Sequence, residues 1–279
     1  MNNKLFFSLL LLSFQTLLFS QDSDKIKGDR NVTIKQTYVD DFESITVTDD
    51  FSIDLIYNSK PSIEVEADDN LHEVIEFAVV DKALTISALK RITSKKTLKI
   101  TVNYGESLAN ISVKNDSEIR SLTSMELGSV SLTVEDNSRA YLNINATDFE
   151  FRSTGKSKTR LNITASGISK IYLNDDSKLD ALINCPIVEF DLLQRTDATI
   201  EGAAEKATIR IDNSSNFYGN NYSLKECSLF IEGNSDATIE VQDQLTFDAS
   251  GKTETFLYGE PTITVNRFTG SARLQKKER

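Results

Sequence analysis

Apolar and polar residues alternate in a fixed phase in nine segments between Ala109 and Arg267. In every segment one position is apolar and the position before it is polar. Side chains alternate between the two faces of a β-strand, so each segment is predicted to form one strand with a buried and an exposed face. The nine apolar residues of this row are Ile111, Leu132, Phe151, Ile171, Phe190, Ile209, Leu229, Phe247 and Val265.

A short polar turn that ends in Ser or Thr follows each segment, six residues after the apolar residue. The first turn residue is Asn, Asp or Gly in seven of the nine repeats, which predicts a backbone with positive φ there. A second, weaker alternation follows most turns, as at Leu142 and Ile144. The hydroxyl residues recur at intervals of 18 to 21 residues and are Ser117, Ser138, Ser157, Ser177, Thr196, Ser215, Ser235, Thr253 and Ser271.

This repeat predicts an all-β fold of the parallel β-helix, or β-solenoid, type. Two or three short strands in about 19 residues cannot enclose a core alone, but stacked repeats can. Each repeat would form one rung that hydrogen-bonds to the next at about 4.8 Å, so nine rungs make a rod on the order of 40 Å long. The regular solenoid is predicted over residues 107–279.

Residues 31–106 contain strand-like stretches without regular spacing. They are predicted to form an N-terminal cap, or the irregular first coils of the same solenoid, within one continuous domain 31–279. A cap is needed because an open end rung exposes strand edges that pair with other chains. The stretch from Asp68 to Ile75 predicts one short helix in this region, with Asn70 and Glu73 spaced as a capping box.

The first twenty residues are predicted to be a signal peptide rather than part of the fold. Lys4 precedes an apolar run from Leu5 to Phe19, which is shorter than the roughly 20 residues that span a bilayer. Cleavage is expected near Ser20, and residues 21–30 are predicted to be a flexible linker. No later apolar stretch approaches that length, so we expect an extracytoplasmic protein without an integral membrane segment, in the periplasm, on the outer surface or secreted.

The net charge bears on the class of partner, and the positions of the cysteines bear on whether a disulfide forms. The formal net charge is -11, and about -12 once Lys4 is removed, which disfavours nucleic acid as a partner. The two cysteines, Cys185 and Cys227, are predicted to lie two rungs apart, about 10 Å along the axis. That separation exceeds the reach of a disulfide, so both are expected to be free thiols.

The residues available for chemistry indicate a protein without a catalytic site. His72 is the only histidine, which excludes Ser-His-Asp and multi-histidine metal sites. The acidic pairs Asp49-Asp50, Asp68-Asp69 and Asp175-Asp176 lie in predicted turns, where Asp is favoured for backbone reasons. We expect no catalytic residue, metal or cofactor. The alternative is a polysaccharide-active lyase or hydrolase, which would need clustered carboxylates along a groove.

One outward row suggests a binding surface on the lateral face. Tyr172 and Phe230 share a row, five residues before the turn hydroxyl, with Arg152 and Arg210. These four residues are predicted to form a flat aromatic and cationic strip for a glycan or a surface protein. The alternative is an ordinary solvated sheet with cross-strand pairs, such as Asp191 between the rungs of Tyr172 and Arg210. The predicted function is binding or adhesion through this face.

Several short segments occur in an order that is similar to a known family. They are, after the signal-peptide-like start, Gly28–Val32, Phe42–Val47, Glu66–Leu71 and Asp81–Ile86, followed by the Ser-rich repeats. In this order the chain resembles bacterial autotransporter-adhesin head domains of unknown function, which are common in Bacteroidetes. The resemblance covers nearly all of the mature chain. It implies a β-helix fold and an adhesin-like role, and it carries over no site residues.

Overall fold

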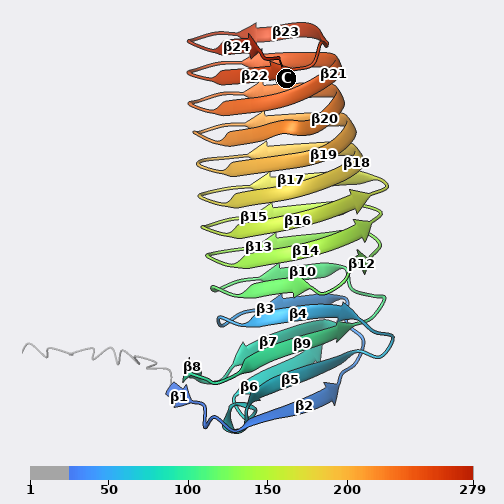
Figure 1. The fold of residues 1–279 in the computed structure, drawn as a ribbon, viewed down its shortest axis with the longest axis vertical. Coiled ribbons are helices and arrows are strands. Elements are labelled where there is room, and N and C mark those ends of the chain that lie inside the picture. The colour runs from blue at the N-terminus through green and yellow to red at the C-terminus, as the bar shows by residue number, and fades with distance from the viewer. Residues whose placement is uncertain (1–24, 279) are drawn as a thin grey trace, which may run out of the picture.

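The chain forms a tall β-solenoid in the computed structural model, which describes residues 25–278 (Figure 1). The predicted signal peptide and the cleavage site near Ser20 lie outside the described residues. The all-β class and the solenoid are confirmed. The repeat length is confirmed as well, because residues that pair in neighbouring rungs, such as Leu142 and Leu161, lie 19 positions apart.

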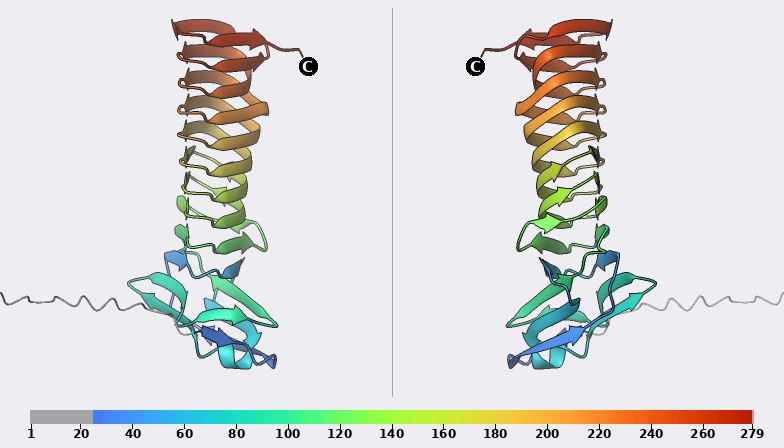
Figure 2. Two further views of the ribbon diagram at one scale, coloured as in Figure 1. Left: turned by 90° about the vertical axis from the view of Figure 1, so that its left-hand side faces the viewer. Right: turned by 90° about the vertical axis from the view of Figure 1, so that its right-hand side faces the viewer.

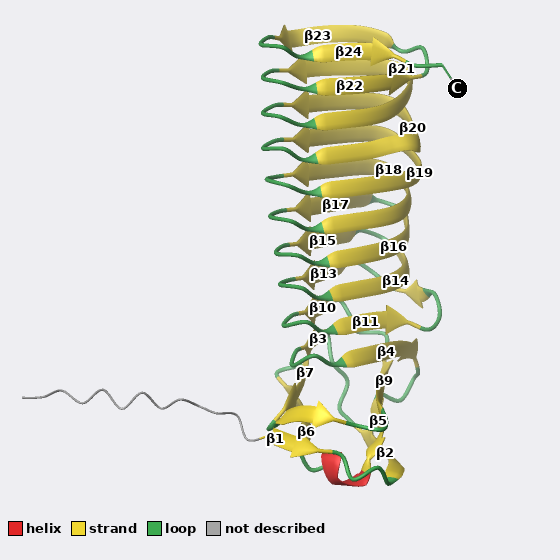
Figure 3. Ribbon diagram, turned by 60° about the vertical axis from the view of Figure 1, so that its left-hand side comes forward, coloured by secondary structure: helices red, strands yellow, loops and turns green. Residues whose placement is uncertain are grey.

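Each rung contributes one strand to a first sheet, turns tightly, and contributes a second strand to a second sheet (Figure 3). The first sheet contains β3 (Ser44–Val47), β10 (Asn110–Val113), β13 (Val130–Val134), β15 (Phe149–Ser153), β17 (Ile168–Leu173) and β23 (Thr262–Phe268). The second contains β4 (Ser52–Tyr57), β11 (Glu118–Ser121), β12 (Met125–Glu126), β14 (Arg139–Ala146), β16 (Lys158–Ala165), β22 (Glu254–Tyr258) and β24 (Arg273–Lys276). Four longer strands bend from the second sheet into the first sheet of the next rung: β18 (Lys178–Leu192), β19 (Asp197–Ile211), β20 (Asn216–Ile231) and β21 (Asp236–Ala249).

The turns have the conformation that their residues predict. The turn hydroxyl residues from Ser117 to Thr253 are at most 2% exposed and so form a buried ladder at one edge of the stack. The first turn residue has positive φ in eight repeats, which confirms the expectation from Asn, Asp and Gly: Asn115, Asp136, Gly155, Asp175, Gln194, Asn213, Gly233 and Gly251. In the last turn the positive φ falls on Gly270.

The apolar row predicted from the sequence forms the core of the first sheet. Its first eight members are at most 2% exposed, whereas the ninth, Val265, is 53% exposed. Val265 lies on β23, the last strand of the first sheet, together with Ile263 at 42% and Phe268 at 50%. No strand of the described chain stacks on the far side of β23, so its inward side chains remain open to solvent.

The order of rungs at the N-terminal end differs from the order of the sequence. The rung of β3 and β4 lies between β10 and β11 on one side and β7 (Ala83–Ala88) and β9 (Leu98–Tyr104) on the other. Antiparallel strands close this end: β5 (Ser62–Asp68) on β9, β2 (Val32–Tyr38) on β5, and β6 (Ile75–Val80) on β7. Figure 2 shows the narrow solenoid rising from this broader end. Residues before Ala109 therefore supply two rungs and an antiparallel cap.

The predicted short capped helix is not confirmed. Residues Asp69–Leu71 form a single 3-10 turn, and its N-cap Asp68 makes no side-chain capping hydrogen bond. Asn70 does not take part in a capping box, because its amide donates to the Lys27 carbonyl at 2.8 Å and accepts from the Asp29 N–H at 2.9 Å. These long-range bonds fix the segment as a corner of the cap, and strand β6 follows.

A buried carboxylate ties the cap together. Asp68 is 0% exposed and accepts hydrogen bonds from the backbone N–H groups of Arg30, Lys96 and Thr97 at 3.0 to 3.2 Å. These donors flank two strands that pair in parallel, β1 (Lys25–Lys27), within the segment 21–30, and β8 (Arg91–Ser94). Burial alone would raise the pKa of Asp68, but the three N–H donors outweigh it and the pKa lies below its ordinary value.

Replacing Asp68 by asparagine is expected to weaken the cap in a pH-dependent way. Because its pKa is lower in the folded chain, Asp68 contributes stability above its unfolded pKa, and that contribution is lost as the pH falls below about 4. The difference in urea midpoint between wild type and Asp68→Asn should therefore be largest at neutral pH and shrink in acid. A difference that stays constant down to acidic pH would contradict this role.

Candidate ligand-binding surface

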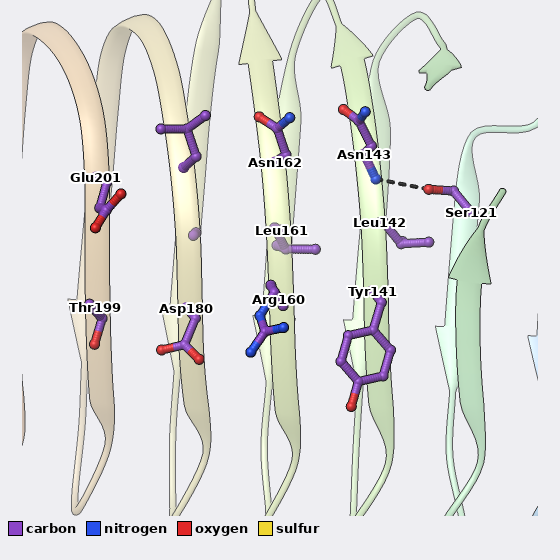
Figure 4. Close-up of a pocket in the computed structure, with 12 residues that line it drawn as sticks. Ser121, Tyr141, Leu142, Asn143, Arg160, Leu161, Asn162, Asp180, Thr199 and Glu201 are labelled. Carbon is purple, nitrogen blue, oxygen red and sulfur yellow. Dashed lines mark hydrogen bonds between the residues drawn. The ribbon is translucent and has the colours of Figure 1, made fainter. Parts of the chain in front are cut away.

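A hollow on the lateral surface lies over the second sheet. It has a volume of about 650 Å³ and crosses β14, β16, β18 and β19. A neighbouring hollow of about 450 Å³ shares several of its residues and continues to Tyr218 on β20. We call the two together the groove. The side chains that project into it form two rows across the rungs (Figure 4).

The first row contains the chemically distinctive side chains. Tyr141, Arg160, Asp180 and Thr199 pair in register from β14 to β19, and Thr199 pairs in turn with Tyr218. Parallel strands are about 4.8 Å apart, so the row extends over roughly 19 Å. Two aromatic rings thus stand at the ends of a line whose middle contains a cation, an anion and a hydroxyl.

The second row supplies amide, apolar and carboxylate groups. Asn143, Asn162, Leu182 and Glu201 pair in register two residues further along the same strands. Leu182 is 39% exposed although it is a large apolar side chain. Each rung therefore presents one polar group of the first row beside one residue of the second, and the pattern is set by the two-residue alternation of the strands.

The charges in the middle of the groove are not paired within the protein. Arg160 and Asp180 take part in none of the side-chain hydrogen bonds or ion pairs found within residues 25–278, although their strands are adjacent. The edge of the groove differs, because Lys178 contacts Asp197 at 2.8 Å and Asn216 donates to the same carboxylate at 2.9 Å. The centre thus retains a free donor and a free acceptor for a ligand.

The pKa values of Asp197 and Tyr218 at this edge are shifted. Burial alone would raise the pKa of Asp197, but hydrogen bonds from Asn216 and Lys178 lower it below its ordinary value, so the carboxylate is ionised at neutral pH. Burial, together with the nearby Asp197 and Asp236, raises the pKa of Tyr218. Tyr218 therefore presents a neutral hydroxyl, which can both donate and accept a hydrogen bond.

The strip predicted from the sequence lies on the opposite lateral face, on the first sheet. Register places its four members in one row, in the order Arg152, Tyr172, Arg210, Phe230, with Asp191 between Tyr172 and Arg210. The guanidinium carbon of Arg152 lies 4.1 Å from the centroid of the Tyr172 ring, and that of Arg210 lies 5.6 Å from the centroid of the Phe230 ring. The structure therefore groups the four residues as two separate cation-π pairs.

These pairs are also held by neighbouring carboxylates. Arg152 forms an ion pair with Glu150 at 2.8 Å, and Arg210 forms one with Asp191 at 3.4 Å. The cross-strand pairing considered as the alternative is thus present at Asp191. A guanidinium covers one face of each ring and its charge is compensated, so the strip offers a ligand fewer free groups than the groove. Ligand binding by the strip stays a prediction.

The groove was missed by the sequence reasoning, although a signal for it exists. Its first row lies three residues after the turn hydroxyl, just as the strip lies five residues before it. Reading that position along the chain gives Tyr141, Arg160, Asp180, Thr199 and Tyr218 in consecutive repeats. The strand after the turn has the weaker apolar alternation, so its outward row attracts less attention.

The other candidate residues have structural roles. Asp49, Asp50 and Asp175 adopt positive φ in turns, and Asp176 contacts Arg195 at 2.7 Å. His72 lies in the cap, with its Nε2 3.0 Å from the Thr33 hydroxyl. Among residues 25–278 there is no group of three or more His, Cys, Asp or Glu side chains that could hold a metal ion. In the same range no helix is long and apolar enough to cross a membrane.

The two cysteines are buried free thiols, as predicted from their positions in the repeat. Burial raises the pKa of Cys227 to about 12, and burial also raises that of Cys185. Both thiols therefore remain protonated at neutral pH and are poor nucleophiles.

Comparison with known proteins is consistent with this fold. The model of a family described as "putative auto-transporter adhesin, head GIN domain" matches residues 41–261. A putative adhesin from Parabacteroides distasonis has a similar structure, with a TM-score of 0.66, 18% identity, and coverage of 91% of this chain and 100% of its own. A putative adhesin from Parabacteroides merdae has a TM-score of 0.57 and 19% identity, covering 92% and 100%.

A third similar structure has a different name. It is a putative lipid binding protein from Parabacteroides distasonis, with a TM-score of 0.59 and 15% identity, covering 91% of this chain and 100% of its own. No curated protein matches the chain. At these identities the solved structures are evidence for the shared solenoid fold alone.

Proposed function

Since the chain belongs to the family described as "putative auto-transporter adhesin, head GIN domain", we propose that it is a non-enzymatic binding module that acts outside the cytoplasm and holds a glycan in the groove of its second sheet. One observation carries the proposal. An unpaired guanidinium and an unpaired carboxylate, Arg160 and Asp180, lie side by side between the rings of Tyr141 and Tyr218.

The chemistry of this row suits a sugar. A pyranose has hydroxyl groups, which need donors and acceptors in about equal number, and apolar ring faces, which stack on aromatic side chains. Arg160 supplies donors, Asp180 supplies acceptors, and Thr199 and the neutral Tyr218 hydroxyl supply both. A strongly anionic or a purely apolar ligand would leave one or more of these groups without a partner.

The repeat also favours an extended ligand. Equivalent positions recur about every 4.8 Å along the axis, so a linear chain lying parallel to the rod meets a new side chain at each rung. The second row of Asn143, Asn162 and Glu201 lies beside the first and offers further polar contacts along the same direction. An oligosaccharide of several units can therefore contact all five rungs from β14 to β20.

The first-sheet strip of Arg152, Tyr172, Arg210 and Phe230 is a second candidate surface for a glycan or a surface protein. Its two cation-π pairs have the residue types expected of such a surface, but each guanidinium is already compensated by a carboxylate. The strip therefore provides a matched control, because it contains an arginine and a tyrosine in adjacent rungs as the groove does.

The proposal can be tested on a glycan and matrix-protein array. The variants Arg160→Ser and Tyr141→Ser are each expected to weaken binding about tenfold or more, because each removes a central contact. The same changes in the strip, Arg152→Ser and Tyr172→Ser, should leave the affinity unchanged. If only the two strip variants lost binding, the binding site would lie on the first sheet instead.

Cleavage of a bound polysaccharide would show that the protein is an enzyme rather than a binding module. The groove contains the three carboxylates Asp180, Asp197 and Glu201, so the array ligands should also be checked for cleavage products. A polysaccharide that is cleaved by the wild type and is left intact by Asp180→Asn would establish the enzymatic alternative. Binding without any product supports the module.

A further inference from the structure

A small parallel sheet at the N-terminal end concentrates positive charge in an acidic chain. Strand β1 pairs with β8 on the side of the tight turns, apart from the main sheet (Figure 1). Residues 25–27 and 90–96 contain six Lys or Arg and no Asp or Glu, whereas the whole chain has a net charge of -11. We call these two segments the basic ribbon.

Five of the six cations of the ribbon form no ion pair through their side chains within the described chain, and two of them lie directly beside one another. Lys25 is directly opposite Arg91 in the register of the two strands, and like charges in that position destabilise a sheet. The side chains of Lys25, Lys27, Arg91, Lys95 and Lys96 form none of the ion pairs found within residues 25–278. A bound anionic surface would relieve this repulsion.

Apolar groups adjoin the cations. Leu89, the residue before the second segment of the ribbon, is 57% exposed. Behind the ribbon is a cavity of about 770 Å³, lined by Leu89, Arg91 and Lys95 and, from the solenoid, by Arg139. Asp49, Asp50 and Asp116 form part of its lining at the turns. The ribbon thus combines five cations that form no ion pair with the described residues, an exposed leucine and a recess.

We propose that the basic ribbon docks the N-terminal end of the rod on the headgroups of an anionic lipid bilayer. A cation next to an anionic membrane surface gains about 1 kcal/mol, and an exposed leucine gains by entering the interface. A soluble polyanion would satisfy the cations but leave Leu89 in water. A bilayer satisfies both, and the cavity gives room for a headgroup.

The charge of the remaining chain sets the orientation. Since the ribbon holds six cations, the rest of the chain is more acidic than the net charge of -11 indicates, and an anionic membrane repels it. The solenoid should therefore stand away from the membrane with both lateral faces accessible. This inference does not depend on the groove, because the ribbon and the groove share no residue.

The test is co-sedimentation of the chain from Gln21 onward with vesicles, since the apolar run of residues 5–19 would itself bind lipid. Phosphatidylcholine vesicles with phosphatidylglycerol should bind the protein, and vesicles of phosphatidylcholine alone should not. The double variant Lys25→Glu/Arg91→Glu is expected to bind at least about 25-fold more weakly, because each cation removed costs about fivefold in affinity. Added salt should weaken wild-type binding.

Two controls make the result decisive. Lys276→Glu/Lys277→Glu makes the same change of charge at the other end of the rod and should bind like the wild type. Leu89→Ser keeps the charge and should bind vesicles more weakly. Equal losses in the two charge-reversed variants, binding to phosphatidylcholine alone, or binding by Leu89→Ser equal to that of the wild type would each overturn the proposal.

Discussion

Replacing Phe190 by alanine is expected to lower the free energy of unfolding by about 3–5 kcal/mol. Phe190 is 0% exposed in the middle of the first sheet. Its ring packs edge-on against Phe217 at 5.2 Å and Tyr222 at 6.2 Å between centroids, so the truncation removes aromatic contacts on two sides and leaves a cavity. The effect should be measured by urea denaturation and by hydrogen exchange.

Hydrogen exchange is needed because a stack of repeats can open locally. In Phe190→Ala, exchange should accelerate first in β18, β19 and β20, which surround the cavity, while the cap stays protected. Phe230→Ala is the matched control, because this phenylalanine lies on the outer face and is only half-buried. If Phe230→Ala lowered the free energy of unfolding as much as Phe190→Ala, the buried apolar row would not be the main source of stability.

Replacing Gly202 by alanine is expected to lower the free energy of unfolding by at least about 2 kcal/mol. The cause is strain in the backbone, because no core side chain is removed. Gly202 lies in β19 with a φ of +109°, and a Cβ atom there would come 2.4 Å from the carbonyl oxygen of Ile183 in the rung below. The neighbouring backbone must move to admit it. Since β19 also carries Thr199 and Glu201, glycan binding by the groove should weaken in parallel.

The control for Gly202→Ala is the same substitution at Gly128. A Cβ atom at Gly128 meets nothing within 4 Å, and its φ is not in the left-handed region. Gly128→Ala should therefore be neutral or slightly stabilising, by restricting the unfolded chain. Equal thermal midpoints for the two variants would mean that the backbone accommodates a Cβ atom beside the Ile183 carbonyl without strain.

The regular part of the fold could be predicted because one rule generates it. Stacked rungs repeat the same environment, so the alternation that buries Leu132 also buries Phe190 and Phe247. The rule fails where the stack ends: Val265 has the right phase but no neighbour above it, and it is exposed. Periodicity predicts which face a side chain takes, whereas burial also requires a rung on each side.

The N-terminal region could not be predicted in the same way, because its contacts are long-range. The polar stretch from Asp68 has the local signals of a helix, but its side chains and backbone bond to Lys27, Asp29 and Lys96 instead. Such bonds outweigh a weak local preference. Nothing in the local sequence indicates that these segments, more than twenty residues apart, meet in one corner.

The residue types of the candidate site could be predicted from the sequence, but the sheet on which they lie could not. The idea of an aromatic and cationic row on a lateral face holds for both sheets. Sequence alone could not show that Arg152 would cover Tyr172, nor that Arg160 would remain without a partner, because both depend on rotamers and on the spacing of neighbouring rungs. Free side chains, rather than residue types, distinguish the groove from the strip.

The position of the β3–β4 rung has a consequence for the order in which the chain folds during synthesis or export. Ser44 pairs with Ala83 and with Asn110, so both neighbours of this rung emerge after it. One edge of each of its strands stays unpaired until about residue 121 is available, because β10 and β11 form the second neighbour. Closing such long loops makes the first stage slow. After that, each new repeat adds to a finished template, and the rod grows in one direction as the chain is delivered.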